Sequence, residues 1–378
     1  MLHSLPILDS QKLNIVDKAR SSRFTWRGQF SPELIEYLLE TLFVEATTIY
    51  DPFCGSGTVL FESSLLGKKS IGSEINPAAW CLSSTIHLNQ LSKAEQNQLI
   101  EKIRLSLANK SEEEIISTVR SEKDEYLKIA LTAILLLGTG NNNYLDLNKI
   151  QKSQKSFISF IQTLDGFTAK ANSYLEDCRK TRIPDDFVDG VITSPPYINV
   201  FNYHQNYRPI MEKLGWFPLD AAKSEIGANR KFRQNRFLTV IQYAQDLGQT
   251  LDELARVMKF HSLGVMIVGR ESRVLGESFD NSKILEHLLD SHSSFTFISS
   301  IERVFKNKFG QEIYEDLIIF KKTASYERLD LKNSTEIGIA FLKAKVPLSK
   351  SENVELLLQA ISKGECLQPS PLFNIQSL

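Results

Sequence analysis

Cysteine is scarce in this sequence, and the few that occur are not grouped. Among 378 residues there are four, Cys54, Cys81, Cys178 and Cys366, with no CxxC pair and no metal-ligand spacing. This distribution argues against a disulfide scaffold and a clustered zinc site, and we expect no bound metal ion. Such a sequence is typical of a reducing compartment.

Long apolar runs and an excess of charge of one sign are also missing. The most apolar stretch, residues 129–137, is too short to cross a bilayer. The N-terminal residues carry no basic flank followed by an apolar run, so we expect no signal peptide, no membrane partner and a cytoplasmic location. The formal net charge is -1, so affinity for a nucleic acid would have to come from a local basic surface.

What is present is the composition of a globular protein, 42% hydrophobic and 24% charged, with a recognisable α/β pattern. Ser31 and Pro32 mark the start of a helix over 31–43. A short β-rich run at 47–50, a glycine loop, a helix at 58–66 and a second strand at 69–73 follow. This strand–loop–helix–strand unit predicts a parallel sheet with a right-handed crossover.

The pattern changes between residues 88 and about 165, where strand signals give way to two or three predicted helices and a loop at 138–143. Strands are expected again at 188–193 and 264–269, then a final pair in 293–305 and 314–322, followed by a mixed tail with one helix around 354–361. We therefore divide the chain into an α/β domain, a helical insertion and a small C-terminal tail, with the bounds 1–87 plus 171–325, 88–170 and 326–378.

The octapeptide DPFCGSGT, Asp51 to Thr58, follows a predicted strand and opens a helix, where α/β sheets bind nucleotides. Its two glycines permit a tight turn and close approach of a ligand, and the helix start offers free N–H donors. It is neither GxGxxG nor a phosphate loop with its lysine, so a ligand without phosphates is favoured. Glu74, seventeen positions after Gly57 and at the end of the next strand, is placed to accept hydrogen bonds from ribose hydroxyls.

The pentapeptide TSPPY, Thr193 to Tyr197, ends another apolar strand. Two consecutive prolines stiffen the loop and remove two N–H donors. The carbonyls, hydroxyl and aromatic ring that remain suit a neutral amino group on a stacked base.

Together these motifs resemble those of the DNA amino-methyltransferases, and RGQFSPELI (residues 27–35) is similar to a cofactor-binding segment of that family. The resemblance implies a Rossmann-like S-adenosylmethionine-dependent methyltransferase fold with a helical insertion. It implies direct methyl transfer from that cofactor to the exocyclic amine of a base flipped out of double-stranded DNA. The cofactor-binding residues it implies are Phe30, Ser31, Pro32, Asp51, Pro52, Phe53, Gly55, Ser56, Gly57, Thr58, Glu74 and Asp177, and the catalytic residues are Ser194, Pro195, Pro196 and Tyr197.

The SPPY form is associated mainly with cytosine-N4 enzymes, which makes N4 methylation of cytosine the first hypothesis. The cofactor motif precedes the catalytic motif, an order permuted relative to many cytosine-N4 enzymes, so adenine-N6 methylation is the alternative. An RNA guanine-N2 methyltransferase is more remote, because those enzymes usually carry a separate RNA-binding domain. A non-catalytic DNA-binding relative is disfavoured by the intact motifs. A restriction–modification system, with a cognate endonuclease, and an epigenetic role both remain open.

A basic cluster follows the catalytic motif, with Glu225 the only nearby acid: Lys223, Arg230, Lys231, Arg233 and Arg236. We expect Arg230, Lys231, Arg233 and Arg236 to contact DNA, mostly through phosphates, against the alternative of a solvated loop. Target recognition could lie in the insertion, in residues 199–245, or in both. His204 is expected to order its loop or line the base pocket rather than to act as a catalyst.

Overall fold

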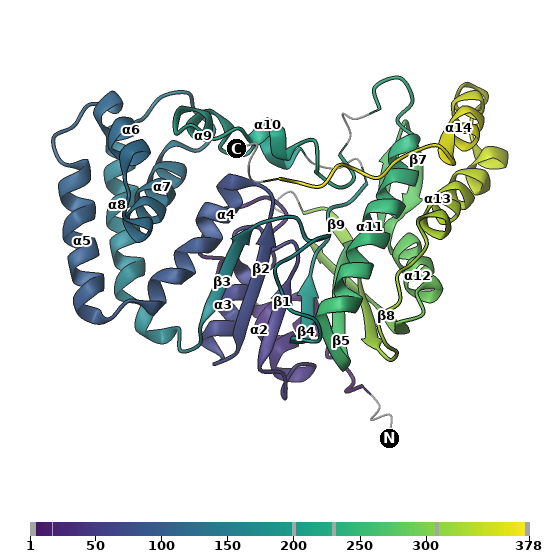
Figure 1. Ribbon diagram of the computed structural model, residues 1–378, viewed down its shortest axis with the longest axis horizontal. Coiled ribbons are helices and arrows are strands. Elements are labelled where there is room, and N and C mark those ends of the chain that lie inside the picture. The colour runs from purple at the N-terminus through teal and green to yellow at the C-terminus, as the bar shows by residue number, and fades with distance from the viewer. Residues whose placement is uncertain (1–4, 17, 199–201, 229–231, 307–309, 375–378) are drawn as a thin grey trace.

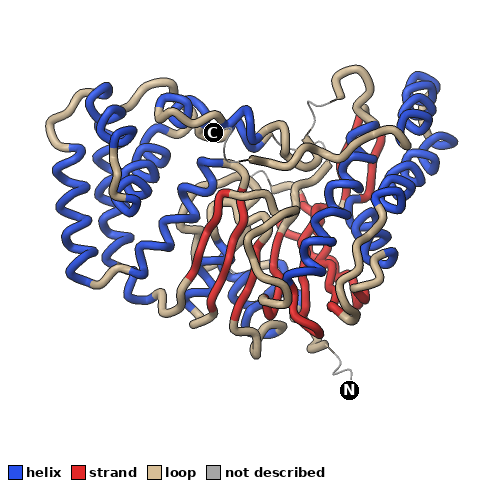
Figure 2. Tube along the Cα trace, viewed as in Figure 1, coloured by secondary structure: helices blue, strands red, loops and turns tan. Residues whose placement is uncertain are grey.

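The computed structural model describes residues 5–16, 18–198, 202–228, 232–306 and 310–374. A seven-stranded sheet lies at its centre, in the order β3-β2-β1-β4-β5-β9-β8 (Figures 1 and 2). The strands are β1 Thr48–Asp51, β2 Lys69–Glu74, β3 Ala171–Leu175, β4 Val188–Thr193, β5 Met258–Gly269, β8 Phe295–Lys306 and β9 Glu312–Lys322. Strands β1 to β5 are parallel, while β9 is antiparallel to both of its neighbours. The α/β Rossmann-like fold class predicted from the sequence is therefore confirmed.

Side chains on the central strands alternate between two apolar layers, as the two-residue period of a strand requires. Ile49 and Ile192 join the layer covered by α2 (Pro32–Thr41), while Tyr50 and Val191 join the layer covered by α11 (Leu238–Val257). Strand β1 is buried on both faces. Such burial is typical of a parallel sheet enclosed by helices.

The order of the strands reverses between β1 and β4, the two central strands of the parallel part. In open α/β sheets, ligands bind at this switch point, beyond the carboxyl ends of the strands. The octapeptide begins at the last residue of β1, and TSPPY begins at the last residue of β4. The topology therefore brings together two motifs that are more than a hundred residues apart in the sequence.

The helical insertion lies between β2 and β3 and forms its own layer beside the sheet (Figure 1). Four α-helices build it, where the sequence predicted two or three, and each start has a capping side chain: Ser92, Ser111, Asp124 and Asp146. Gly138 lies inside α7 and not in the predicted loop. Glycine is needed there because a Cβ would come within 2.6 Å of Ile150 on the next helix. The insertion follows α4 Pro77–Ser83 and η1 Ser84–Gln90, and comprises α5 Lys93–Leu107, α6 Glu112–Ser121, α7 Glu125–Thr139, α8 Leu147–Gln162 and η2 Leu164–Gly166.

The C-terminal tail is part of the core. The predicted helix is present as α14 (Ser351–Gly364), but α13 (Leu331–Lys345) was missed, and it packs directly on α11. Small residues bring the two helices close: Gly338 lies against Ile241, and Gly248 against Ser334. After α14 the chain returns across the carboxyl ends of the strands (Figure 1).

The remaining elements are short, apart from the helices α3 and α12, which pack on the sheet. They are α1 Ser10–Asn14, α3 Thr58–Leu65, η3 Tyr203–Gln205, α9 Arg208–Lys213, α10 Pro218–Ala221, β6 Glu271–Val274, β7 Glu277–Asp280, α12 Asn281–Ser291 and η4 Val346–Leu348. Among the described residues, no helix combines the length and the apolar character needed to span a membrane.

Candidate active site

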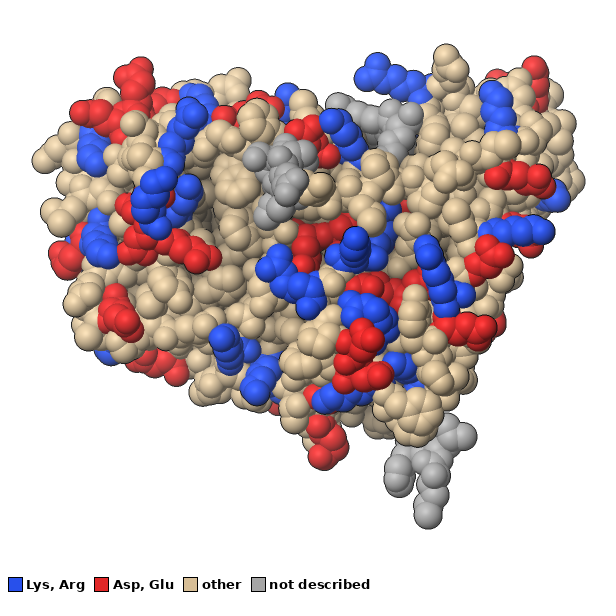
Figure 3. Space-filling model, in the orientation of Figure 1, with Lys and Arg blue, Asp and Glu red and all other residues tan. Residues whose placement is uncertain are grey.

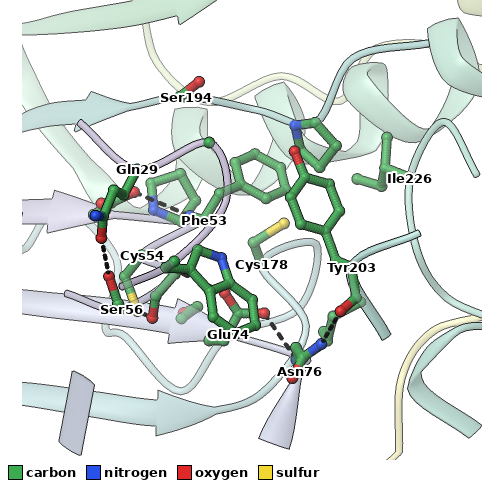
Figure 4. Close-up of a pocket in the computed structure, with 18 of the residues that line it drawn as sticks. Gln29, Phe53, Cys54, Ser56, Glu74, Asn76, Cys178, Ser194, Tyr203 and Ile226 are labelled. Carbon is green, nitrogen blue, oxygen red and sulfur yellow. Dashed lines mark hydrogen bonds between the residues drawn. The ribbon is translucent and has the colours of Figure 1, made fainter. Parts of the chain in front are cut away.

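A pocket opens at the switch point of the sheet, and both predicted motifs contribute to its wall (Figure 4). Its described lining comes from seven short segments of the chain: residues 26–30, 51–56 with Thr58, 73–76, 176–178, Ser194 with Pro196, Tyr203 and 224–226. The site is thus assembled from the carboxyl ends of β1 to β4 and from the segments that follow β4.

Asp51 joins the octapeptide to the catalytic motif. It is 2% exposed, and its Oδ1 accepts hydrogen bonds from Thr193 Oγ1 at 2.6 Å and from the Phe53 N–H at 3.1 Å. Burial raises the pKa of Asp51 to about 7 against the opposing effect of these two donors. A cation placed beside this carboxylate would stabilise its charged form.

The glycine loop has the tight geometry predicted for it. Gly55 and Gly57 both have positive φ, 52° and 91°, and a Cβ on Gly57 would approach Ser83 Cβ to 2.9 Å. Gly57 serves as the N-cap of α3 and lies outside the described pocket lining, so its role is to shape the turn. Ser56, which does line the pocket, donates from Oγ to Gln29 Oε1 at 3.0 Å.

Glu74 ends β2 and faces the pocket, as predicted. Its Oε1 accepts from the Asn76 N–H at 2.7 Å and its Oε2 from the Gly55 N–H at 3.0 Å. Burial raises the pKa of Glu74 to about 7. The two backbone donors fix the carboxylate in place and leave lone pairs on both oxygens for ligand hydroxyls.

The segment before α2 contributes only in part as predicted. Trp26, Gln29 and Phe30 line the pocket. Ser31 and Pro32 lie outside its described lining: Ser31 Oγ donates to Glu33 Oε2 at 2.6 Å, and Pro32 lines a smaller adjoining cavity. Ser31 occupies the N-cap position of α2 without a side-chain capping bond.

Asp177, after β3, lines the pocket, but its carboxylate is already engaged. Arg179 donates to Oδ1 through Nε at 2.9 Å and to Oδ2 through Nη2 at 2.7 Å, and the backbone N–H of Phe373 donates to Oδ2 at 2.9 Å. Arg179 also reaches Asp246 on α11 at 3.0 Å and the carbonyls of Ser370 and Pro371. The C-terminal segment therefore holds this end of the pocket together.

Only part of the catalytic motif lines the pocket, and the rest packs behind it. Ser194 and Pro196 line the pocket, whereas Pro195 and Tyr197 lie outside its described lining. The Tyr197 ring lies against Gly269 at the end of β5, where a Cβ would come within 2.7 Å of it. Tyr197 Oη is 3.5 Å from Ser194 Oγ and donates to Glu315 Oε1 at 3.3 Å.

Some pocket residues were not identified from the sequence. Trp26 directly precedes the RGQF segment and Gln29 lies within it, so carrying over the whole segment and the residue before it, rather than residues 30–32 alone, would have found both. Tyr203 carried no motif; it reaches into the pocket from beside Asn76, whose Nδ2 donates to the Tyr203 carbonyl at 3.0 Å (Figure 4). His204 is buried and its Nδ1 pairs with Glu225 Oε2 at 2.8 Å, as expected of a residue that orders the loop.

The chemistry of the pocket fits S-adenosylmethionine, the cofactor implied by the sequence motifs. Two carboxyls, Asp51 and Glu74, can receive a cationic group and ribose hydroxyls, while Phe53, Cys178 and Ile226 supply apolar walls for a purine. Among the described residues no group of three His, Cys, Asp or Glu side chains is arranged to hold a metal ion.

Only part of the basic cluster can be placed. Arg230 and Lys231 lie outside the described residues. Lys223 is exposed and pairs with Asp220 at 2.7 Å, Arg233 is exposed, and Arg236 is half-buried. On the face shown in Figure 3, acidic and basic side chains are interspersed, so that face carries no broad field of one sign.

Comparison with known proteins supports the family resemblance for the cofactor-binding part. A family model described as DNA methylase, of the N6/N4 methyltransferase type, matches residues 7–82, which include the octapeptide and Glu74 but not TSPPY. A Type II methyltransferase, M.MjaII of Methanocaldococcus jannaschii, is 38% identical over 88 residues, covering 23% of this chain and 16% of that protein. The matched part of the chain thus spans about a sixth of the relative's length.

The solved structures that match this chain are only distantly similar to it. A SAM-dependent methyltransferase from Methanosarcina mazei has a TM-score of 0.36 and 14% identity, covering 74% of this chain and 93% of its own. The rRNA methyltransferase aviRa from Streptomyces viridochromogenes has a TM-score of 0.34 and 14% identity, covering 89% and 98%. The fold assignment therefore rests on the strand order and the positions of the motifs described above.

Proposed function

We propose that this chain is a site-specific DNA methyltransferase that uses S-adenosylmethionine to methylate an exocyclic amine in duplex DNA. We favour N4 of cytosine as the target, and N6 of adenine is the alternative. The hydrogen bond from Thr193 to Asp51 is the observation that carries this proposal. It ties the loop proposed for the cofactor to the SPPY motif, so a methyl donor and an amine would meet in one pocket.

The side chains of the pocket suggest separate roles in cofactor binding and in activation of the target amine. The cofactor supplies an activated methyl group, and Asp51 and Glu74 would hold its charged and hydroxylated parts. A base amine is a poor nucleophile, since its lone pair is delocalised into the ring. Acceptance of its hydrogens by Ser194 Oγ and the Pro195 carbonyl would favour a pyramidal nitrogen with an available lone pair. Acceleration then comes mainly from positioning and electrostatics.

The choice between cytosine and adenine rests on the SPPY sequence, whereas the matched family model spans both N6 and N4 enzymes. The target base must leave the double helix to reach Ser194, so base flipping is part of the proposal. Contacts to the DNA backbone are assigned to Arg230, Lys231, Arg233 and Arg236, and target recognition to the helical insertion, to residues 199–245 or to both. A cognate endonuclease is the partner expected if the enzyme belongs to a restriction–modification system.

The decisive experiment is mass spectrometry of nucleosides from the DNA of cells that express the wild type or Ser194→Ala. We expect N4-methylcytosine with the wild type and far less of it with the variant. N6-methyladenine would instead select the second target. Absence of any methylated base in DNA, or N2-methylguanosine appearing in RNA, would contradict a DNA enzyme.

A further inference from the structure

Behind the catalytic motif, a line of polar groups continues from Ser194, the proposed amine contact, to groups that the proposed cofactor and base contacts do not use. It runs from Ser194 to Tyr197 and on to Glu315 of β9. Glu315 Oε2 accepts from Arg303 Nη1 of β8 at 2.7 Å. Arg303 Nε in turn donates to the Leu13 carbonyl in the N-terminal segment at 3.0 Å. The line therefore connects the pocket to a partly buried ion pair.

The position of Tyr197 in this line is closely constrained. A Cβ on Gly269 would come within 2.7 Å of its ring, and one on Gly227 would come within 2.7 Å of its carbonyl oxygen. The following N–H, of Ile198, donates to Asn281 Oδ1 at 3.3 Å, and Asn281 donates to the Gly269 carbonyl. Packing on two sides thus leaves the Tyr197 hydroxyl facing Ser194 and Glu315.

The proposed reaction needs such a line. Methyl transfer leaves the amine nitrogen with a positive charge and one hydrogen too many. A serine hydroxyl is a very weak base, so Ser194 can accept this proton only if it gives up its own. Glu315 is the carboxylate at the end of the line, and its side chain is 15% exposed.

We propose that Glu315 is the final acceptor of the proton lost by the target amine, reached through Ser194 and Tyr197; this rests on the proposed function. The nitrogen gives its proton to Ser194 Oγ, the Ser194 hydroxyl gives its own to Tyr197 Oη, and the Tyr197 hydroxyl gives its own to Glu315. One N–H bond breaks, one O–H bond forms at Glu315, and the nitrogen becomes neutral. Separations of 3.5 and 3.3 Å are long for such transfers, and catalytic hydrogen bonds commonly tighten when substrate binds.

The charges around Glu315 suit an acceptor. Burial raises the pKa of Glu315, and Asp316 on the same strand adds to this, while Arg303 and the Tyr197 hydroxyl oppose the rise. Asp316 is itself held by Arg270 at 2.6 Å, so its charge is partly offset. Glu315 is therefore a stronger base than an exposed glutamate while remaining paired with a cation.

The first test is kinetic and uses Glu315→Gln, with Glu312→Gln on the exposed part of β9 as the matched control. General acid–base groups typically contribute ~10²–10⁴-fold, so Glu315→Gln should slow single-turnover methylation of DNA by ~10² with unchanged cofactor affinity. The wild-type rate should rise with pH as Glu315 ionises, and this dependence should disappear in Glu315→Gln. Turnover of Glu315→Gln at the wild-type rate would overturn the relay.

The second test needs no turnover. The carboxyl of Glu315 is followed by ¹³C NMR of glutamate-labelled protein and assigned by its absence in Glu315→Gln. Tyr197→Phe should raise the pKa of Glu315, because it removes a donor to the carboxylate, whereas Tyr314→Phe on the exposed side should not. An unchanged titration in Tyr197→Phe would overturn the relay. A wild type that methylates no DNA would overturn the proposed function and the relay with it.

Discussion

The two ends of the pocket are built differently. At the end lined by Asp177, Arg179 is 1% exposed and pairs with Asp177 and Asp246, which are 4% and 0% exposed, at 2.7 and 3.0 Å. At the end lined by Ser194, the contacts that link Ser194 to Tyr197 and Tyr197 to Glu315 are 3.5 and 3.3 Å long. The first end is complete before any ligand arrives. The second has its groups aligned but not in close contact, as would suit the base-binding role proposed for it.

The largest effect should follow from breaking the buried end. Arg179→Met would leave two buried carboxylates without their cation, and removing one partner of a buried pair typically costs ~3–5 kcal/mol. We expect a loss of that size in the free energy of unfolding, together with weaker cofactor binding, because Asp177 would no longer be fixed. Denaturant unfolding and calorimetry would measure the two.

Arg182→Met is the matched control for this change. Arg182 is close in sequence and pairs with Glu176, but its side chain is 58% exposed. Exposed pairs contribute at most ~1 kcal/mol. Equal losses for the two variants would show that the buried network contributes no more than a surface pair.

At the other end, Ser194→Ala should affect chemistry and leave stability almost unchanged. Removing one preorganised polar partner of a reacting group typically lowers turnover by ~10²–10³. Cofactor affinity should stay at the wild-type value, since Asp51 and Glu74 are untouched. Methylation assays with calorimetry on the same samples would check this, and retention of most of the turnover would remove Ser194 from the mechanism.

The pH dependence of cofactor binding should report on Asp51 and Glu74, whose pKa values are raised to about 7 by burial. At a pH well below the ordinary pKa values of 3.8 for Asp51 and 4.5 for Glu74, both carboxyls are protonated in the folded and unfolded states. As pH rises towards 7 the unfolded chain ionises first, so these groups lower the free energy of unfolding.

A cationic, hydroxyl-bearing cofactor favours the charged carboxylates. Its binding should therefore tighten from pH 5 to about 7, by at most tenfold per pH unit for each group that ionises, with release of protons. Calorimetry in buffers of different ionisation enthalpy would detect the released protons. Glu74→Gln should weaken the pH dependence of cofactor affinity, because one of the two titrating carboxyls is removed. A wild-type affinity that does not change with pH would mean that neither carboxyl contacts the cofactor.

The smallest effect concerns the basic cluster, Arg230, Lys231, Arg233 and Arg236. If each contacts a phosphate, changing all four to Ala should reduce the slope of log affinity against log salt by about one unit per contact. Cofactor affinity should not change. DNA binding at several salt concentrations measures the slope, and identical slopes would transfer the DNA contact to the helical insertion.

Local signals in the sequence predicted a large part of this protein. The strand, glycine loop and helix around Asp51 to Thr58 form where they were expected, because turn residues and apolar periodicity act within a few residues. Strand and helix boundaries near the motifs agree within one or two positions. Helix α13 was missed, since it is held by close packing of Gly338 on Ile241 rather than by a strong signal of its own.

The sequence by itself determined the fold class and the two motifs, since both depend on short segments whose chemistry is fixed by residue type. Tertiary structure decided which groups meet. Arg179 binds carbonyls about 190 residues away, and Tyr197 turns towards Glu315, 118 residues away. Such contacts depend on strand order and on the path of the returning C-terminal segment. No local pattern encodes them, because each partner is an ordinary charged or aromatic residue until the sheet brings the two together.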